Sequence, residues 1–442
     1  MPVVLAPMAG ITNAAYRRLC SEQGAGLYVC EMITSRGLVE GDATTRQMLV
    51  FDEHERVRSV QLYGTDPAYV GKATEILCTE YGVDHVDLNF GCPVPKVTRK
   101  GGGAALPWKR VLLGEILEAA VTAAGRHGVP VTMKTRKGID DDHLTFLDAG
   151  RIAQESGVAA IALHGRTAIQ GYSGEADWDA IAELVAHVDI PVLGNGDIWE
   201  ADDALRMVDR TGAAGVVVGR GCLGRPWLFR DLAAAFSDRW VPEEDRLPRV
   251  PEERPRNEGA SRRAHPINPR VPEENRRRPR VPEARPRNEG ASRRARLTHP
   301  RVPEERPRNE GASRRARSTL PTLPTLGEVS VMMHRHAELL AQHMGEERGC
   351  KEFRKHVTWY LKGFPAGGDL RRDLALVDTV AELDALLGRL DPDAPFPVGE
   401  LGAPRGRQGS PRKGVALPEG WLDDTDGSGC VLREDARETT GG

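Results

Sequence analysis

The chain lacks several features of membrane, secreted and metal-binding proteins. No stretch of its 442 residues approaches the ~20 consecutive apolar residues of a membrane-spanning helix. The first residues, MPVVLAPMAG, have neither a basic start nor a long apolar core, so we expect no signal peptide. The seven cysteines include no CxxC pair, which argues against a disulfide framework and a zinc site. We therefore expect reduced thiols and a cytoplasmic protein.

Lysine is absent between Arg249 and Arg317, where 21 Arg and 10 Glu give a formal charge of +11, whereas the rest of the chain is acidic. The sequence RVPEERPRNEGASRRA begins at Arg249 and again at Arg301, with a near copy at Arg280 and a truncated copy at Arg270. Such repeats cannot bury enough apolar surface to fold, so we expect a disordered insertion over residues 239–325. Its arginines would add non-specific phosphate affinity, but the interspersed Glu and the near-exact repetition favour a tolerated expansion between two domains.

Residues 1–238 alternate short apolar runs with amphipathic, helix-like stretches. Eight β units with intervening helices in about 240 residues predict a (β/α)8 TIM barrel. A doubly wound sheet is the alternative, but it would usually use fewer strands. The eight apolar runs cover residues 3–7, 26–32, 59–64, 85–91, 130–135, 160–165, 191–197 and 215–221.

The chain after the insertion divides into two further parts. Residues 326–392 carry apolar residues at i, i+3 and i+4 spacing, which predicts a small C-terminal helical bundle. Residues 393–442 are rich in Gly, Pro and Asp, and we expect a flexible C-terminal tail.

In a barrel of this kind, catalytic groups lie at the carboxyl ends of the strands. Those ends contain only two carboxylates, Glu31 and Asp197, and they stand apart, so we expect no metal site. The full set at the predicted strand ends is Pro7, Met8, Ala9, Glu31, Gln61, Asn89, Cys92, Lys134, Arg136, His164, Arg166, Asn195, Gly196, Asp197, Gly219 and Arg220.

Two groups of these residues suggest a ligand. The glycine-rich segments GNGDI and GRGCLGRPW suit a phosphate, which main-chain N–H groups and Arg220 would hold. Gln61 and Lys134 suit a flat heteroaromatic ring, and a lysine near N1 and O2 of an isoalloxazine would stabilise a reduced, anionic flavin. Each residue also has an ordinary explanation, since GNGD can be a plain turn, His164 a structural histidine and Cys92 a buried thiol. Lys134 in an apolar strand and Cys92 between a strand and Pro93 favour function.

The chain resembles the tRNA-dihydrouridine synthases, in particular the bacterial subgroup with a C-terminal helical domain. The similarity covers the whole barrel and the start of the helical part, but not the insertion or the tail. The matching segments are APMAGITN (6–13), EMITS (31–35), VQLYGTDP (60–67), VDLNFGCPVPKVTRKGGGAAL (86–106), VTMKTRKG (131–138), ALHGRTAIQGYSGEADW (162–178), PVLGNGDI (191–198), GVVVGRGCLGRPWLF (215–229) and RKHVTWYLKG (354–363).

The resemblance implies an enzyme that uses FMN, reduced by NADPH, to saturate a uridine ring in tRNA. The catalytic cysteine of the family falls on Cys92, and Asn89, Arg136 and Arg166 match positions expected to face the substrate base or its phosphate. We also expect a monomer without a membrane or metal partner. The family's flavin contacts fall on Pro7, Met8, Ala9, Gln61, Lys134, His164, Asn195, Gly196, Asp197, Gly219 and Arg220.

The chemistry of the implied reaction explains the choice of a thiol. Reduction of the uracil C5=C6 bond takes a hydride to C6 and a proton to C5, and the proton needs an acid that is protonated at neutral pH. Thiols, with an unperturbed pKa of ~8.5, meet that condition without activation. We therefore interpret Cys92 as a proton donor and not as a nucleophile.

A base in folded tRNA must leave its stack to reach such a site. We expect Lys351, Arg354, Lys355, His356 and Lys362, near Trp359 and Tyr360, to form an RNA platform; a solvated helix face is the alternative. Two other functions remain open. Another flavin barrel acting on a free pyrimidine would need no helical domain, and a non-catalytic RNA-binding relative would need neither Cys92 nor Lys134.

Overall fold

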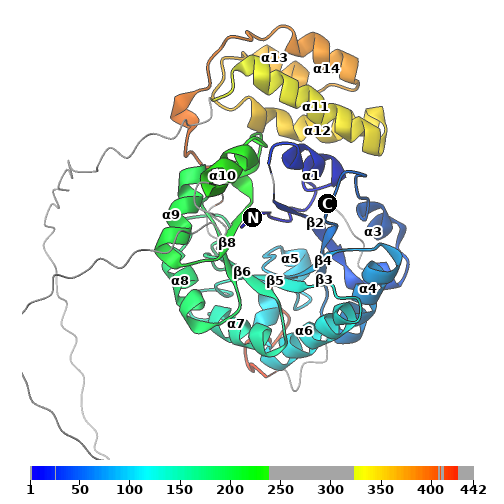
Figure 1. Ribbon diagram of the computed structural model, residues 1–442, viewed down its shortest axis with the longest axis vertical. Coiled ribbons are helices and arrows are strands. Elements are labelled where there is room, and N and C mark those ends of the chain that lie inside the picture. Colours follow the sequence, from blue (N-terminus) through cyan, green and yellow to red (C-terminus); the bar gives the residue numbers. More distant parts are fainter. Residues whose placement is uncertain (1, 25, 238–322, 407–408, 410–412, 427–442) are drawn as a thin grey trace, which may run out of the picture. The chain divides into compact units, whose positions relative to one another are not determined.

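The computed structural model describes residues 2–24, 26–237, 323–406, 409 and 413–426, and its centre is a closed barrel of eight parallel strands (Figure 1). Each strand pairs with the next along the chain, and β8 closes on β1, with Val3 opposite Val216 and Leu5 opposite Val218. The predicted TIM barrel is confirmed. The strands are β1 (Val3–Leu5), β2 (Leu27–Thr34), β3 (Ser59–Tyr63), β4 (His85–Phe90), β5 (Val131–Arg136), β6 (Ala160–His164), β7 (Val192–Asn195) and β8 (Gly215–Val218).

Helices surround this barrel, and α1, α3, α4 and α8 begin at a capping Asn or Asp side chain. Asp66, for example, accepts hydrogen bonds from the N–H groups of Ala68 at 2.8 Å and Tyr69 at 3.2 Å where Pro67 opens α4. The helices of the barrel are α1 (Ala14–Ser21), α2 (Ser35–Val39), α3 (Ala43–Met48), α4 (Pro67–Glu80), α5 (Pro95–Thr98), α6 (Arg110–Gly125), α7 (Phe146–Glu155), α8 (Trp178–His187), α9 (Ala201–Thr211) and α10 (Leu228–Ser237), with the short 3₁₀ helices η1 (Gly103–Trp108) and η2 (Arg220–Cys222).

Strands β4 and β5 turn polar side chains toward the inside of the barrel. Side chains alternate between the two faces of a strand. Val86, Leu88 and Met133 accordingly join the hydrophobic core between strands and helices. The alternate positions Asp87 and Lys134 line cavities inside the barrel. This polar interior leads directly to the carboxyl ends of the strands.

The C-terminal segment is helical, as predicted. Its helices are α11 (Leu326–Met344), α12 (Glu346–Tyr360), α13 (Gly368–Leu374) and α14 (Val380–Leu387), followed by the short 3₁₀ helix η4 (Val398–Glu400). Thr325 and Glu328 form a capping box at the start of α11. Within the described ranges, every helix is too short or too polar to cross a membrane.

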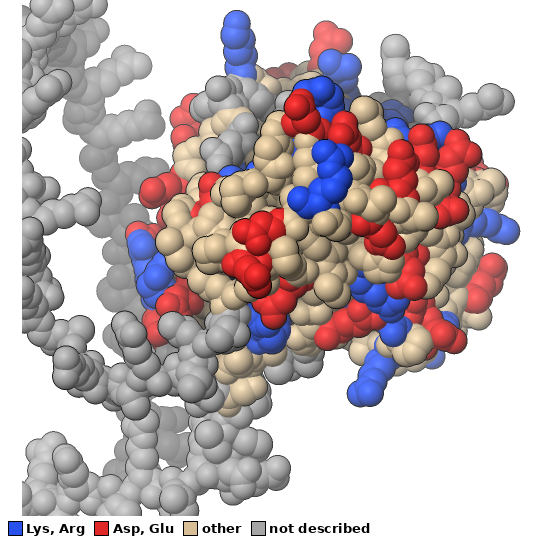
Figure 2. Space-filling view, turned by 90° about the horizontal axis from the view of Figure 1, so that it is seen from above, with Lys and Arg blue, Asp and Glu red and all other residues tan. Residues whose placement is uncertain are grey.

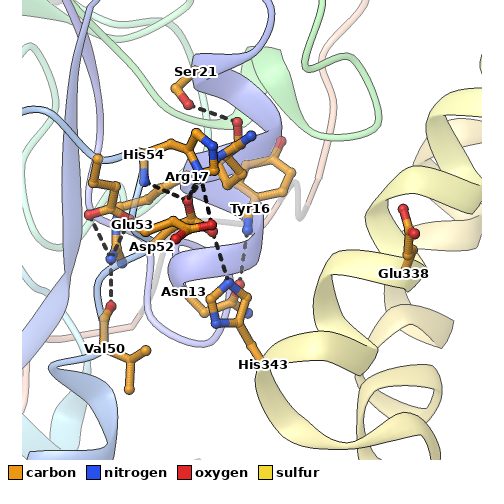
Figure 3. A network of polar contacts seen from close by, with 12 residues as sticks. Asn13, Tyr16, Arg17, Ser21, Val50, Asp52, Glu53, His54, Glu338 and His343 are labelled. Atoms are coloured by element: carbon orange, nitrogen blue, oxygen red, sulfur yellow. Dashed lines mark hydrogen bonds and ion pairs between the residues drawn. The ribbon is translucent and has the colours of Figure 1, made fainter.

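Helix α11 lies beside α1 of the barrel (Figure 1), and ion pairs join the two parts. Arg335 Nη2 lies 2.9 Å from Glu22 Oε1 at the end of α1. At the C-terminal end of α11, His343 Nε2 lies 3.5 Å from Asp52 Oδ2 (Figure 3). Asp52 also pairs with Arg18 of α1 at 2.7 Å. Ion pairs therefore join the helical segment to the barrel at the middle and at the C-terminal end of α11.

Two sequence predictions concern the remaining parts of the chain. The predicted disordered insertion over 239–325 lies almost wholly outside the described residues. The predicted flexible tail over 393–442 does not fit its described part. Phe396 is 6% exposed and packs edge-on against Phe364 and Trp227. Trp421 is 1% exposed and packs against the barrel.

Candidate active site

The carboxyl ends of the strands enclose a cavity of about 390 Å³. Every residue predicted for catalysis, cofactor or substrate lines this cavity except Arg166. The lining residues among the predicted set are Pro7, Met8, Ala9, Gln61, Asn89, Cys92, Lys134, Arg136, His164, Asn195, Gly196, Asp197, Gly219 and Arg220.

Cys92 lies on the turn that follows β4, and main-chain hydrogen bonds hold this turn from two sides. Asn89 Oδ1 accepts from the N–H groups of Gly91 at 3.0 Å and Cys92 at 2.9 Å. The carbonyl of Cys92 accepts from the N–H of Ala104 at 3.0 Å. These hydrogen bonds therefore restrict the backbone conformation of the turn that places the Cys92 thiol at the cavity wall.

Buried polar side chains continue from Asn89 into the barrel. Asn89 Nδ2 donates to Gln61 Oε1 at 3.0 Å, and Gln61 Nε2 donates to Asp87 Oδ2 at 2.6 Å. The Thr132 hydroxyl donates to Asp87 Oδ1 at 2.6 Å, and His85 Nε2 lies 2.9 Å from that hydroxyl. Asp87 was not among the predicted site residues. Its position two residues before Asn89 in a strand was the signal that could have found it, since both face the barrel interior.

The electrostatics of the cavity favour an anionic ligand. Burial and the neighbouring Arg136 lower the pKa of Lys134 to about 7, against the opposing effect of Asp87. Burial, followed by Arg136 and Lys134, lowers the pKa of His164 well below its usual range, so its imidazole is neutral at physiological pH. A bound anion would offset the repulsion between protonated Lys134 and Arg136.

The ends of β7 and β8 meet at Asp197. This residue has a left-handed backbone with φ of 56°, which is uncommon outside glycine. Its Oδ2 accepts from the N–H of Ala176 at 2.6 Å and from Arg166 Nη2 at 2.8 Å. Arg220 Nη2 lies 3.7 Å from its Oδ1, and the Arg220 guanidinium lies 4.5 Å from the centre of the Tyr172 ring. Asp197 therefore orients two arginines at this end of the cavity.

Arg136 and Arg166 occupy different environments. Arg136 lines the cavity, where its Nε donates to the carbonyl of Gly91 at 2.8 Å and its Nη1 donates to that of Gly171 at 2.9 Å. It thereby joins the Cys92 turn to the loop after β6. Arg166 has a side chain only 2% exposed, and its Nε donates to the carbonyl of Ser173 at 3.0 Å. Arg166 supports Asp197 from behind the cavity wall.

The donors in this cavity fit a cofactor with a planar hydrogen-bonding ring and an anionic group. Gln61 lies on β3 and Lys134 on β5, the two strands that pair with β4. Arg220 and the main chain of Gly219 lie at the opposite strands. The carboxylate of Asp197 also lines the cavity, and its ion pair with Arg166 offsets its charge.

The predicted RNA platform on and after α12 stays a prediction, but two of its members do not fit a surface role. His356 and Tyr360 are 0% and 1% exposed, so their inclusion was wrong. Trp359 does reach the rim of the cavity. Figure 2, which looks onto the C-terminal helices, shows acidic and basic side chains interspersed. Ion pairs with carboxylates engage Lys351, Arg354, Lys355 and Lys362.

Comparison with known proteins gives consistent matches. The family described as dihydrouridine synthase (Dus) matches residues 4–252 and 301–391. A protein of Mycobacterium tuberculosis named probable tRNA-dihydrouridine synthase is 48% identical over 433 residues, which cover 96% of this chain and 90% of the relative. A protein of the same name from Mycobacterium leprae is 44% identical over 99% of this chain and 100% of its own length. The tRNA-dihydrouridine synthase B of Vibrio cholerae is 31% identical over 88% of this chain and 95% of its own.

Proposed function

The chain belongs to the dihydrouridine synthase family, and from that premise we propose that it reduces the C5=C6 bond of uridines in tRNA to 5,6-dihydrouridine. The observation that carries the proposal is that a thiol, Cys92, and a buried amine, Lys134, line one cavity at the carboxyl ends of the strands. A non-catalytic RNA-binding relative would need neither group.

The cofactor we propose is FMN, with NADPH as the electron donor. Gln61 and Lys134 would hold the ring, while Arg220 and the main chain at Gly196 and Gly219 would hold the phosphate. When bound and reduced, FMN supplies the hydride for C6 of the uracil ring. Protonated Lys134 would stabilise negative charge in the cavity.

Cys92 supplies the second hydrogen of the product. Its Sγ–H bond breaks as a C–H bond forms at C5, and the thiolate regains a proton from solvent. The hydrogen bonds from the Gly91 and Cys92 N–H groups to Asn89 fix the turn from which the thiol acts. Arg136 strengthens this arrangement, because it donates to the Gly91 carbonyl.

The substrate base must leave the tRNA stack to enter a cavity of this kind. Helix α12 contributes Trp359 to the cavity rim, which supports a role for the C-terminal helices in binding tRNA. A flavin enzyme that acts on a free pyrimidine would have no use for these helices.

The proposal is tested by mass spectrometry of tRNA from a host that lacks the gene, complemented with the wild-type protein or with Cys92→Ala. We expect dihydrouridine to be lost at a defined position, to return with the wild type and to stay absent with the variant. Unchanged dihydrouridine at every position in the deletion strain would contradict the proposal and favour one of the two other functions.

The cofactor has a separate test. The purified protein should be yellow, with the absorbance of bound FMN. A colourless preparation that cannot be reconstituted with FMN contradicts the cofactor assignment, whatever the tRNA analysis gives.

A further inference from the structure

The segment Gly101–Ala105 lies directly against the backbone of Cys92. The N–H of Ala104 donates to the carbonyl of Cys92 at 3.0 Å. Gly103 has φ of 56°, and a Cβ at this position would lie 2.4 Å from the same carbonyl oxygen. No larger residue permits so close an approach. The position of Cys92 therefore depends on the position of this segment.

The other side of the same segment is covered by Trp421. The indole Nε1–H donates to the carbonyl of Ala105 at 3.0 Å. A Cβ at Gly101 would lie 2.4 Å from the ring carbon Cη2 of Trp421. Trp421 is 1% exposed and forms a small apolar cluster with Ala105 and Ile139. Residues 101–105 are thus enclosed between Cys92 and a tryptophan more than 300 positions later in the chain.

Residues 413–426, here termed the C-terminal strap, are anchored at the start of α6. Lys109 is 2% exposed, its ammonium donates to the carbonyl of Asp424, and it lies 5.2 Å from the centre of the Trp421 ring. The N–H of Arg110 donates to the carbonyl of Thr425 at 2.9 Å. Lysine is rarely buried unless paired. The strap supplies a carbonyl and an aromatic face to this buried cation, so its place on the barrel is specific.

We propose that Trp421 is a positioning residue for Cys92 and that it acts through the segment Gly101–Ala105. Without the indole, the segment loses a hydrogen bond and the packing on its outer side. The Cys92 carbonyl then loses a fixed partner, and the thiol becomes both more accessible and less well placed. The inference rests on the proposed function in so far as Cys92 is the proton donor. The positional coupling itself does not require any activity.

The first test measures the rate at which iodoacetamide alkylates Cys92 in the full-length protein, by mass spectrometry of its peptide. Cys78, partly exposed on α4, serves as the internal reference. We expect Trp421→Ala to raise the Cys92 rate on the order of tenfold while the Cys78 rate stays constant. Trp421→Phe, which keeps most of the packing but loses the N–H donor, should give a smaller rise.

Trp227→Ala is the matched control, because Trp227 is also buried, at 3% exposure, but belongs to a different hydrophobic cluster from Trp421 and packs against Phe396. An equal rise of the Cys92 rate in this control would overturn the proposal, since it would indicate general loosening. An unchanged Cys92 rate in Trp421→Phe and in folded Trp421→Ala would also overturn it. If Trp421→Ala does not fold, the alkylation rate of Cys92 in Trp421→Phe alone tests the proposal.

The second test is kinetic and depends on the proposed function. With tRNA as substrate, Trp421→Ala should lower kcat on the order of tenfold, because a small misplacement of a reacting group is costly. KM for tRNA and the flavin content should stay unchanged. If the wild type forms no dihydrouridine, the proposed function fails, whereas the alkylation rates still decide the role of Trp421.

Discussion

Asp87 Oδ2 accepts a hydrogen bond from Gln61 Nε2 at 2.6 Å, and both side chains are buried inside the barrel. A carboxylate can only accept, so this contact determines which way the Gln61 amide points. Gln61 then presents Oε1 to Asn89, which must present Nδ2 in return. Asn89 is left with its Oδ1 toward the N–H groups of the Cys92 turn. A buried charge thereby sets the orientation of two amides and of the turn that carries the thiol.

The first prediction concerns the substitution Asp87→Asn. An amide can present either N–H or C=O to Gln61, so Gln61 and Asn89 lose their defined orientation. We expect the rate of dihydrouridine formation to fall by about tenfold, the change that ~1.4 kcal/mol makes in a rate. Asp84→Asn is the control, since Asp84 is exposed just before β4. Wild-type activity in Asp87→Asn would contradict the orienting role.

Asp87 also illustrates what the sequence alone could and could not predict. The barrel and its strand ends followed from the alternation of apolar runs, because each run had to be buried on both faces of a parallel sheet. Gln61 and Lys134 stood out as polar residues near the ends of such runs. Asp87 lies level with Gln61 in the sheet, between Val86 and Leu88. Its spacing from Asn89 places it on the inner face of the barrel, but its hydrogen bonds to Gln61 on β3 and Thr132 on β5 are evident only from the structure.

Other differences arise from contacts between distant parts of the chain. Arg136 is the last residue of β5, whereas Arg166 lies two residues after the end of β6. Main-chain carbonyls of the following loop and Asp197 engage Arg166 behind the cavity. His356 and Tyr360 lie among basic residues in sequence, but the helix turns them toward the barrel. Trp421 lies among residues typical of loops, and its pocket is formed about 300 positions earlier. Such partners cannot be read from local sequence.

The second prediction concerns protons taken up when the cofactor binds. The pKa of Lys134 is lowered to about 7, so at pH 8 about nine-tenths of the amine is neutral. Acceptor atoms of FMN beside the amine would raise this pKa, and binding at pH 8 should therefore take up close to one proton. At pH 6 the amine is already protonated, and the uptake by this group should vanish.

Titration calorimetry in buffers of different ionisation enthalpy measures this uptake. The Lys134→Arg variant is the control, because arginine stays protonated throughout the range. Subtracting its values also removes the contribution of the FMN phosphate. Equal proton uptake in the wild type and the variant at pH 8 would show that Lys134 does not contact the cofactor.

The third prediction separates Arg166 from the residues that face substrate. Its guanidinium donates to the carbonyls of Ser173 and Gly174 and to Asp197 at the same time. Arg166 uses two separate nitrogens for these contacts, whereas lysine carries its three N–H donors on one nitrogen and cannot reach acceptors placed for the planar guanidinium. Arg166→Lys should therefore loosen the end of β7 and lower the ratio of bound flavin to protein several-fold. KM for tRNA of the flavin-loaded fraction should remain unchanged.

Arg206→Lys is the control for this change. Arg206 is 66% exposed and pairs only with Asp203 among the described residues, so its substitution should alter neither quantity. A raised KM with full flavin content in Arg166→Lys would instead support the original prediction that Arg166 faces the substrate.

The fourth prediction concerns acid stability where the C-terminal helices meet the barrel. His356 is fully buried, with its ring 4.4 Å from that of His336 and 5.8 Å from that of Tyr16 on α1. Neither of its ring nitrogens has a hydrogen-bond partner within the part of the chain that the structure describes. Burial, then the electrostatic effects of His336 and Lys355, lower the pKa of His356 well below its usual range. The same burial lowers the pKa of His336 to about 3.

The sign of the pH effect follows from these directions. Below pH ~6.5 the unfolded chain binds a proton at each histidine, whereas the folded chain binds it only at much lower pH. The two buried histidines therefore do not destabilise the folded chain above pH ~6.5. Below that pH, each of them lowers the free energy of unfolding by up to ~1.4 kcal/mol per pH unit. His356→Leu removes one of these groups and also an unpaired buried imidazole. At pH 7 the free energy of unfolding of this variant should match that of the wild type or exceed it by ~1 kcal/mol. The difference in favour of the variant should grow by ~2 kcal/mol at pH 5.

Urea unfolding at pH 7 and pH 5 measures both differences, with His187→Leu as the control at an exposed position of α8. The control should show the same pH dependence as the wild type, because His187 is exposed and lies outside the buried junction of α12 with α1. If the stability of His356→Leu falls between pH 7 and pH 5 as steeply as that of the wild type, His356 is protonated in the folded protein at pH 5. The junction between α12 and α1 would then have to admit water, contrary to its burial.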